Sequence, residues 1–69
     1  MENSQDYILN AQWLTERQVH EYTRLSLSTL RSHRFYGKGI PYSKIGRSVR
    51  YSMADVVAFM KAKRILPRS

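Results

Sequence analysis

The sequence predicts a small α+β domain in which three short helices flank a two-stranded hairpin. Two observations predict it: three Ser or Thr residues stand at helix-start signals between apolar residues, and one glycine divides two short basic and apolar segments. With 69 residues, the chain has the length of one domain and buries only about 60% of its unfolded surface. It has little room for a deep pocket, so we expect a protein that is not an enzyme.

The first helix is predicted from the segment LTERQV, residues 14–19. Thr15 can cap the helix, and Gln18, three residues later, can reach back to complete a capping box. The leucine and valine that bracket the segment stand at the two staple positions. These signals predict a helix over about residues 16–23.

The second helix is predicted from LSLSTL, residues 25–30, in which Ser26 is the cap and the outer leucines form the staple. We expect Leu25 and Leu30 to face the core. The segment GKG, residues 37–39, ends this helix, which therefore covers about residues 27–36.

The third helix is predicted from YSMADV, residues 51–56, with Ser52 as the cap and Asp55 completing a capping box. It is expected to run over about residues 53–63. Helical spacing places four apolar residues on one face, namely Met53, Val56, Val57 and Met60.

A hairpin is predicted between the second and third helices, from KIGRSVRY at residues 44–51. Pro41 comes before it, where it does not interrupt a central strand. Residues 46–48 are expected to form the turn, because glycine supplies the positive φ that a tight turn needs. Alternation along the strands is expected to turn the apolar residues inward, namely Ile45, Val49 and Tyr51, and the cations outward, namely Lys44, Arg47 and Arg50.

The sequence is divided into a flexible arm at residues 1–11, a domain at 12–65 and a tail at 66–69. The arm carries two acids and no cation, unlike a signal peptide. The longest strictly apolar run, residues 56–60, is too short to cross a bilayer, and there is no cysteine. We therefore expect a soluble, cytoplasmic protein.

Charge is distributed unevenly along the chain. Residues 1–23 hold four acids and one cation, whereas residues 24–69 hold eleven cations and one acid, which gives the net charge of +7. Such a one-sided field predicts a polyanionic partner, either nucleic acid or an anionic membrane. A membrane is the less favoured partner, because the third helix ends in cations but lacks a broad lysine-lined face.

The short spacing between the first two helices favours nucleic acid. Only three or four residues separate them, which is typical of a helix-turn-helix, whose second helix can enter a DNA major groove. A basic hairpin that follows such a pair is a wing, and its cations can contact phosphates or the minor groove. The predicted fold is therefore a winged helix-turn-helix that binds double-stranded DNA.

Candidate DNA contacts fall on three parts of the chain. On the second helix they are Ser28, Arg31, Ser32, Arg34 and Phe35. In the wing they are Lys44, Arg47, Ser48 and Arg50. Backbone contacts are further expected from Thr15, Arg24 and Lys38. Arg31 has the geometry for a bidentate pair with guanine, unless it is simply a solvated residue, and Phe35 either touches a thymine methyl or packs under the wing.

Arg47, at the wing tip, suits a narrow minor groove, and Lys44 and Arg50 suit phosphates. His20 and His33 are joined by no cluster of acids or cysteines, so we expect no metal site, no cofactor and no small-molecule substrate. The tryptophan at the start of the domain is expected to be a core anchor.

From about Trp13 to Lys63, the chain resembles the small winged-helix DNA-binding domains of the excisionase type, which are related to the MerR family and include AlpA-like phage regulators. The resemblance is carried by LT at 14–15, STLR at 28–31, GKGIPYSKIGRSVRY at 37–51 and the helix start SMADVVAFM. It implies a second helix in the major groove and a wing in or beside the minor groove.

The resemblance leaves two functions open. One is an excisionase of a phage or mobile element, a recombination directionality factor that would assemble cooperatively on repeated sites, bend DNA and direct a tyrosine or serine integrase toward excision. The other is a small AlpA-like transcriptional regulator. Either would associate with the nucleoid when bound. A hypothesis of another class is an interaction module that binds an acidic regulator.

The chain departs from the family pattern around the end of the first helix. Arg24 stands where the family usually has glycine, in a position that favours the left-handed conformation. We expect strain there. His20, Tyr22 and Thr23 stand where alanine and leucines are usual, which predicts a less tightly packed first helix.

Overall fold

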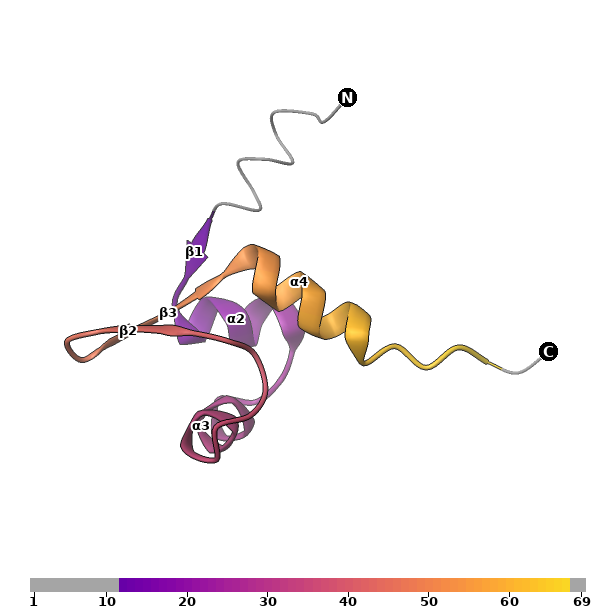
Figure 1. Ribbon diagram of the computed structural model, residues 1–69, viewed down its shortest axis with the longest axis horizontal. Helices are drawn as coiled ribbons and strands as arrows, with labels where there is room; N and C mark the ends of the chain where they lie inside the picture. Colours follow the sequence, from indigo (N-terminus) through magenta and orange to yellow (C-terminus); the bar gives the residue numbers. More distant parts are fainter. Residues whose placement is uncertain (1–11, 68–69) are drawn as a thin grey trace, which may run out of the picture.

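The computed structural model describes residues 12–67, which form three helices and a three-stranded antiparallel sheet with strand order β1-β3-β2 (Figure 1). The elements are β1 (Trp13–Leu14), α2 (Glu16–Thr23), α3 (Leu27–Phe35), β2 (Ser43–Ile45), β3 (Ser48–Ser52) and α4 (Met53–Ala62). This small α+β arrangement confirms the predicted winged helix-turn-helix. The arm at residues 1–11 and the last two residues of the tail lie outside the described residues.

Local hydrogen bonds explain why the helices begin where the sequence predicts. The Thr15 Oγ1 accepts from the Gln18 N–H at 3.1 Å, and the Gln18 Oε1 accepts from the Thr15 N–H at 2.9 Å, so the capping box is complete. The Ser26 Oγ accepts from the Thr29 N–H at 3.0 Å.

Within residues 12–67, no helix has the length and apolar character needed to cross a membrane.

The capping box predicted for the third helix is wrong in its second half. The Ser52 Oγ accepts from the Asp55 N–H at 3.1 Å as expected, but no return bond from the Asp55 carboxylate occurs among the described residues. Aspartate is one methylene shorter than the Glu or Gln that closes such a box. Ser52 is also the last residue of β3 and pairs with Trp13 across the sheet, so its backbone belongs to a ladder as well as to a cap.

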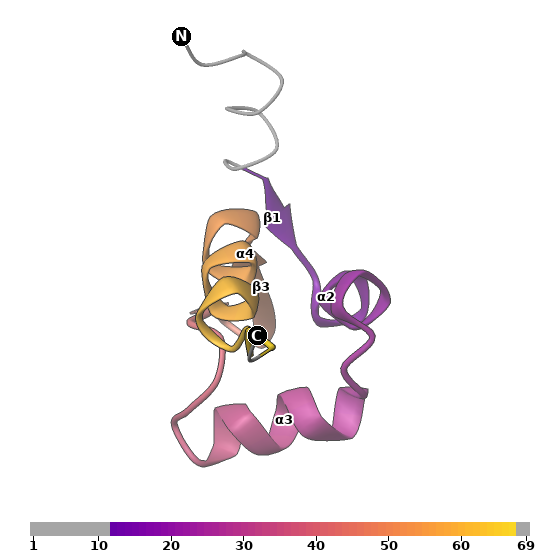
Figure 2. The same ribbon diagram turned by 90° about the vertical axis from the view of Figure 1, so that its right-hand side faces the viewer.

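The turn between α2 and α3 is held by polar side chains. Arg24 has a φ of 65°, so the expected left-handed strain is confirmed. The His20 Nδ1 lies 2.7 Å from the Leu25 carbonyl oxygen, which requires Nδ1 to carry the donated hydrogen. The Thr23 Oγ1 donates to the Val19 carbonyl at 2.8 Å and accepts from the Leu25 N–H at 3.1 Å. The polar residues of α2 therefore fix the turn that sets α3 across α2 (Figure 2).

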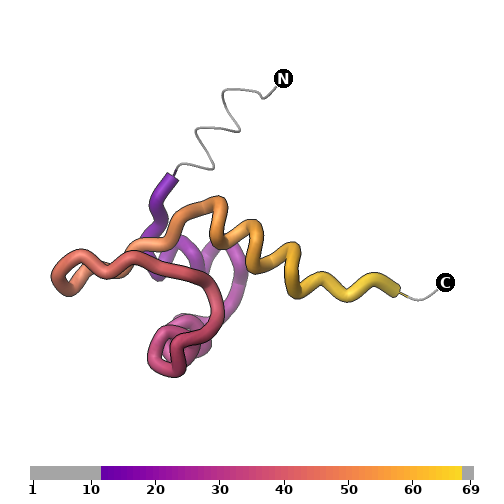
Figure 3. Tube along the Cα trace, viewed as in Figure 1, coloured from indigo at the N-terminus to yellow at the C-terminus, as the bar shows by residue number. Residues whose placement is uncertain are grey.

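The core takes one buried residue from each element except β2, and one from the loop that precedes β2. These residues are Leu14, Val19, Leu30, Ile40, Tyr51 and Val56. Leu25 packs against them, as predicted. β2 contributes none of them, and the hairpin extends away from the helices (Figure 3).

The prediction that Trp13 is a core anchor is wrong. Trp13 is 56% exposed, because β1 alternates and its neighbour Leu14 takes the inward position. On α4 the stripe that meets the core consists of Met53, Val56 and Phe59, whereas Met60 is 40% exposed.

The register of the hairpin corrects the predicted orientation of the wing residues. The turn consists of two residues, Gly46 and Arg47, with positive φ only at the glycine, as in a Gly-X hairpin turn. Lys44 therefore pairs with Val49, and Ile45 pairs with Ser48. A three-residue turn would have paired Ile45 with Val49 instead. Because a one-residue shift turns every side chain to the other face, the predicted inward position of Ile45 is wrong, and this residue is 70% exposed.

The two faces of the sheet now have distinct compositions. Residues directly opposite in an antiparallel ladder share a face. The inner face, toward the core, carries Leu14, Tyr51, Val49 and Lys44. The outer face carries Trp13, Ser52, Arg50, Ser43, Ile45 and Ser48. The wing cations that were expected to point outward together are thus divided between the two faces.

The Glu16 carboxylate joins three elements. Its Oε1 accepts from the Arg31 Nε at 3.1 Å, and its Oε2 accepts from the Arg34 Nε at 2.9 Å. The Tyr51 hydroxyl of β3 lies 3.4 Å from the same Oε2, which makes it the weakest of the three contacts. The first residue of α2 thereby ties α3 to the base of the wing.

The ionised form of Glu16 is favoured in the folded protein. Burial raises the pKa of this carboxyl, but the hydrogen bonds and charges of Arg34 and Arg31 outweigh burial, so its pKa is lowered from the ordinary value of 4.5. The position of Glu16 in the first turn of α2 also suits a negative charge.

Replacing Arg24 with glycine is expected to increase the free energy of unfolding by up to about 1.5 kcal/mol. A non-glycine residue in the left-handed region costs roughly 1–2 kcal/mol, and the greater freedom of glycine in the unfolded chain offsets about 0.5–1 kcal/mol of the gain. Urea unfolding at fixed pH and salt measures the change. Arg24→Lys keeps both the charge and the strain and should unfold like the native protein; a glycine variant no more stable than the lysine variant would contradict the prediction.

The Glu16 contacts predict a pH-dependent stability. Because the folded-state pKa of Glu16 is lowered, its contribution is fully present above the unfolded pKa and is lost as pH falls through the folded pKa. The free energy of unfolding should therefore decrease more steeply between about pH 5 and pH 3 in the native protein than in Glu16→Gln. The other carboxylates are common to both proteins, so urea unfolding across this range isolates Glu16. Parallel curves would contradict the assignment.

Candidate nucleic-acid interface

One face of α3 is exposed along its whole length. Ser28, Arg31, Ser32 and Phe35 are all exposed, and their spacing of three, four and seven residues places them on one side of the helix. Leu30, on the other side, is buried. We call these four exposed residues the α3 ridge.

The α3 ridge has the chemistry to contact a polyanion. The first turn of α3 contains no acid, and its cap is an uncharged serine. A helix with this arrangement can enter a major groove with its N-terminal residues against base edges. Figure 2 shows α3 at one end of the described part of the molecule.

Arg31 and Arg34 are both predicted DNA contacts on the second helix, but their environments differ. The Arg34 side chain is 24% exposed, and its guanidinium carbon lies 5.7 Å from the centre of the Tyr42 ring. Its hydrogen bond to Glu16 raises the pKa of Arg34. The Arg31 side chain is 62% exposed. Arg34 therefore holds α3 in place, while most of Arg31 is accessible to a ligand.

Tyr51 completes the set of partners around Arg34. Its ring is buried and lies 6.1 Å from the ring of Tyr42, measured between centroids. Burial, followed by the charge of Glu16, raises the pKa of Tyr51. The hydroxyl therefore remains a hydrogen-bond donor toward Glu16 under ordinary conditions.

Phe35 does not pack under the wing. Its side chain is 82% exposed, and its ring meets that of Tyr36 edge-on, with centroids 5.0 Å apart. Tyr36 is itself 69% exposed. Packing under the wing is therefore wrong, and contact with a thymine methyl stays a prediction.

The wing presents different cations on different sides. Arg47 and Ser48 are exposed at the tip, and Lys44 is exposed on the inner face, beyond Val49. Arg50 is on the outer face and half-buried, and its Nη1 donates to the Val49 carbonyl at 2.8 Å. The inner face is also the side on which Tyr51 meets Glu16 and, through it, α3. Lys44 thus shares a side with α3, and Arg50 does not.

The outer face of the sheet has a shallow hollow. It is lined by Trp13, Ser43, Ile45 and Arg50. Sequence reasoning missed this surface because it placed Trp13 and Ile45 inside. A two-residue reading of the turn would have revealed the exposed position of Ile45.

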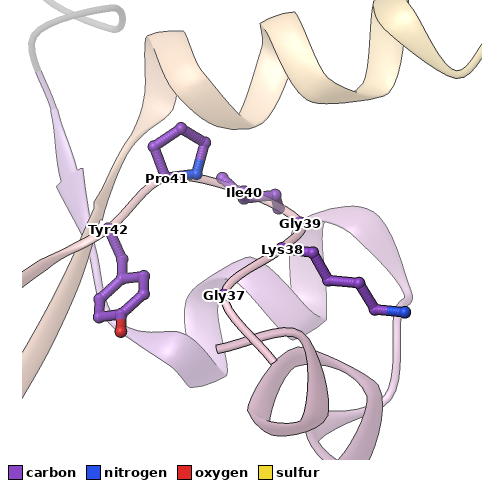
Figure 4. Close-up of a pocket in the computed structure, with 6 residues that line it drawn as sticks. All are labelled: Gly37, Lys38, Gly39, Ile40, Pro41 and Tyr42. Carbon is purple, nitrogen blue, oxygen red and sulfur yellow. The ribbon is translucent and has the colours of Figure 1, made fainter. Parts of the chain in front are cut away.

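The loop from α3 to β2 surrounds a second hollow, lined by residues 37–42 (Figure 4). Lys38 and Tyr42 extend from different parts of this loop, and Ile40 is buried in the core. A Cβ on Gly39 would lie 2.6 Å from the His33 Nδ1, so this position has space only for glycine. His33 is therefore a packing residue, and its ring lies 6.4 Å from that of Phe59, measured between centroids.

The three predicted backbone contacts occupy separate places. Thr15 is half-buried and uses its hydroxyl as a helix cap. Arg24 is exposed in the turn between the helices, and Lys38 is exposed in the loop after α3. Nothing in the described residues brings these three side chains together with the α3 ridge.

Glu16 is the site residue that sequence reasoning missed. The sequence explains it as an ordinary acid in a first helical turn, yet it bonds to residues 15 and 18 positions away. No local pattern signals contacts over such separations.

The family model of a helix-turn-helix domain matches residues 13–64. No curated protein and no solved structure is similar enough to the chain to count as a match. The matched segment includes the two capped helices, the exposed α3 ridge and the basic wing. The chain therefore belongs to this helix-turn-helix domain family, whose two-helix unit is a DNA-binding one.

Proposed function

We propose that the protein reads a specific sequence in double-stranded DNA, with α3 in the major groove and the wing on neighbouring phosphates or the minor groove. The observation that carries the proposal is the exposed α3 ridge, on a helix that Glu16 links to the inner face of the sheet, the face on which Lys44 also lies. Direct readout is assigned to Arg31, which has the geometry to donate two hydrogen bonds to guanine. The protein acts by binding and not by catalysis.

We further propose that the protein is an excisionase of a phage or mobile element. It would assemble on repeated sites, bend the DNA and direct a tyrosine or serine integrase toward excision. The resemblance from Trp13 to Lys63 supports this role, as does the small size of the α3 ridge, because one copy reads only a few base pairs. A small transcriptional regulator would use the same domain, and the experiment below separates the two.

The first experiment selects bound fragments from a random duplex library at physiological salt. Enriched, closely spaced repeats are expected. Their position beside an attachment site favours the excisionase, and a reconstituted excision reaction with the neighbouring integrase should then depend on the protein. Repeats beside a promoter alone would favour the regulator. No enrichment at all would contradict sequence-specific DNA binding and favour an interaction module with an acidic partner.

Arg31→Ala is expected to weaken binding to the selected duplex by about 1–3 kcal/mol and to relax base preference at one position. Binding to a random duplex should change less, because the hydrogen bonds from Arg31 to guanine contribute little there. Arg17→Ala, which removes an exposed cation from α2, is the matched control. Equal losses on both duplexes would remove Arg31 from direct readout. Fluorescence anisotropy at fixed salt measures both affinities.

Lys44→Ala is expected to weaken all duplexes alike and to lower the slope of log affinity against log salt by about one unit. Arg50→Ala should leave the slope nearly unchanged, because its guanidinium is on the outer face and bonds to its own strand. The two variants remove the same charge from one hairpin and so control for each other. The reverse outcome would place DNA against the outer face of the sheet.

A further inference from the structure

We propose that Glu16 is a positioning residue for base recognition, which holds the Arg31 guanidinium through Nε and leaves its two terminal amino groups for guanine. This inference rests on the proposed function, because it concerns the residue that would read the DNA. Nothing in the sequence pattern or the family match assigns such a role to Glu16.

The contacts of Glu16 make it a fixed anchor. Both carboxylate oxygens are occupied: Oε2 by Arg34 at 2.9 Å, with Tyr51 at 3.4 Å, and Oε1 by Arg31 at 3.1 Å. Arg34 and Tyr51, from α3 and β3, therefore hold the carboxylate independently of Arg31. The Glu16 side chain is only 15% exposed.

The contact with Arg31 uses one part of the guanidinium. The Nε–H donates a hydrogen bond to the Glu16 Oε1, and the guanidinium donates no other hydrogen bond among the described residues. The two terminal amino groups form the end of the fork, and their parallel N–H bonds match guanine O6 and N7. Glu16 thus restrains the stem of Arg31 while 62% of the side chain stays exposed.

Restraint of this type increases discrimination in two ways. An arginine that is already held loses less rotamer freedom on binding, which favours the correct base. The Glu16 charge also offsets part of the attraction of Arg31 to phosphates, and so weakens binding that is independent of sequence. Glu16 should therefore raise the ratio of specific to non-specific affinity from both sides.

A purely structural role for Glu16 is the alternative, because Arg34 and Tyr51 also depend on it. The two roles differ in one respect. A positioning residue acts through Arg31, so its effect on base discrimination disappears when Arg31 is absent. A structural residue acts on the whole of α3, so its effect remains.

The test combines Glu16→Gln, Arg31→Ala and the double variant in the full chain. The probes are the duplex selected from the random library, the same duplex with each G·C pair replaced by A·T, and a random duplex. Glu16→Gln is expected to lower discrimination between the first two by about threefold to tenfold and to tighten binding to the random duplex. In the Arg31→Ala background it should not lower discrimination further.

Glu21→Gln is the matched control, because it neutralises an exposed carboxylate on the same helix that has no contact with Arg31. It should leave discrimination unchanged. An equal effect of the two glutamine variants would reduce the role of Glu16 to general charge. An equal loss of discrimination with and without Arg31 would assign it to the fold. Either outcome overturns the inference while leaving specific binding by the native protein intact.

A measurement on the native protein does not depend on how well Glu16→Gln folds. The Arg31 Nε–H should give a separate, slowly exchanging NMR signal, assigned by its loss in Arg31→Ala. Rapid exchange, as in a solvated arginine, would show that the anchor is absent and would overturn the inference. If the native protein shows no base discrimination at all, the proposed function itself falls, and this inference falls with it.

Discussion

The arrangement of α3 and the wing depends on one carboxylate. Glu16 begins α2, and its bonds reach two arginines of α3 and a tyrosine of β3, so a single side chain sets the recognition helix against the wing. Removing the carboxylate would leave the half-buried Arg34 guanidinium without its hydrogen-bond acceptor, which is costly. In a chain with a net charge of +7, this acid also relieves repulsion between cations that would otherwise crowd the base of the wing.

The small core explains why that carboxylate matters. Six buried residues form the core of the described part of the chain, and β2 supplies none of them. β2 is therefore held by its pairing with β3 and by the glycine turn, and the Tyr51 contact holds the base of the wing. A short domain buries little apolar surface, so its margin of stability is small. Polar contacts that fix the orientation of its elements are therefore more important than in a larger protein.

Sequence reasoning succeeds where the determinants are local and fails where they are not. The helix starts are predicted because a cap and its partner lie three residues apart, and the strain at Arg24 follows from one position in a motif. The hairpin is predicted, but Ile45 is assigned to the wrong face. The register depends on whether Ser48 belongs to the turn or to the strand. Trp13 is misplaced because β1 exists only through its pairing with β3, far along the chain. Glu16 is missed for the same reason.

The structure also narrows how one copy could recognise DNA. Of the five residues predicted on the second helix, Arg34 is engaged by Glu16 and Tyr42, which leaves the four residues of the α3 ridge. A bidentate arginine contributes about 1–3 kcal/mol of discrimination, and serines and an aromatic contribute less directional readout. Eleven cations within residues 12–67 meanwhile favour any duplex. Under the proposed function, a single copy would therefore have modest specificity against a strong non-specific background. Two proposed features, a restrained Arg31 and several copies on adjacent sites, would each raise the ratio of specific to non-specific affinity without enlarging the domain.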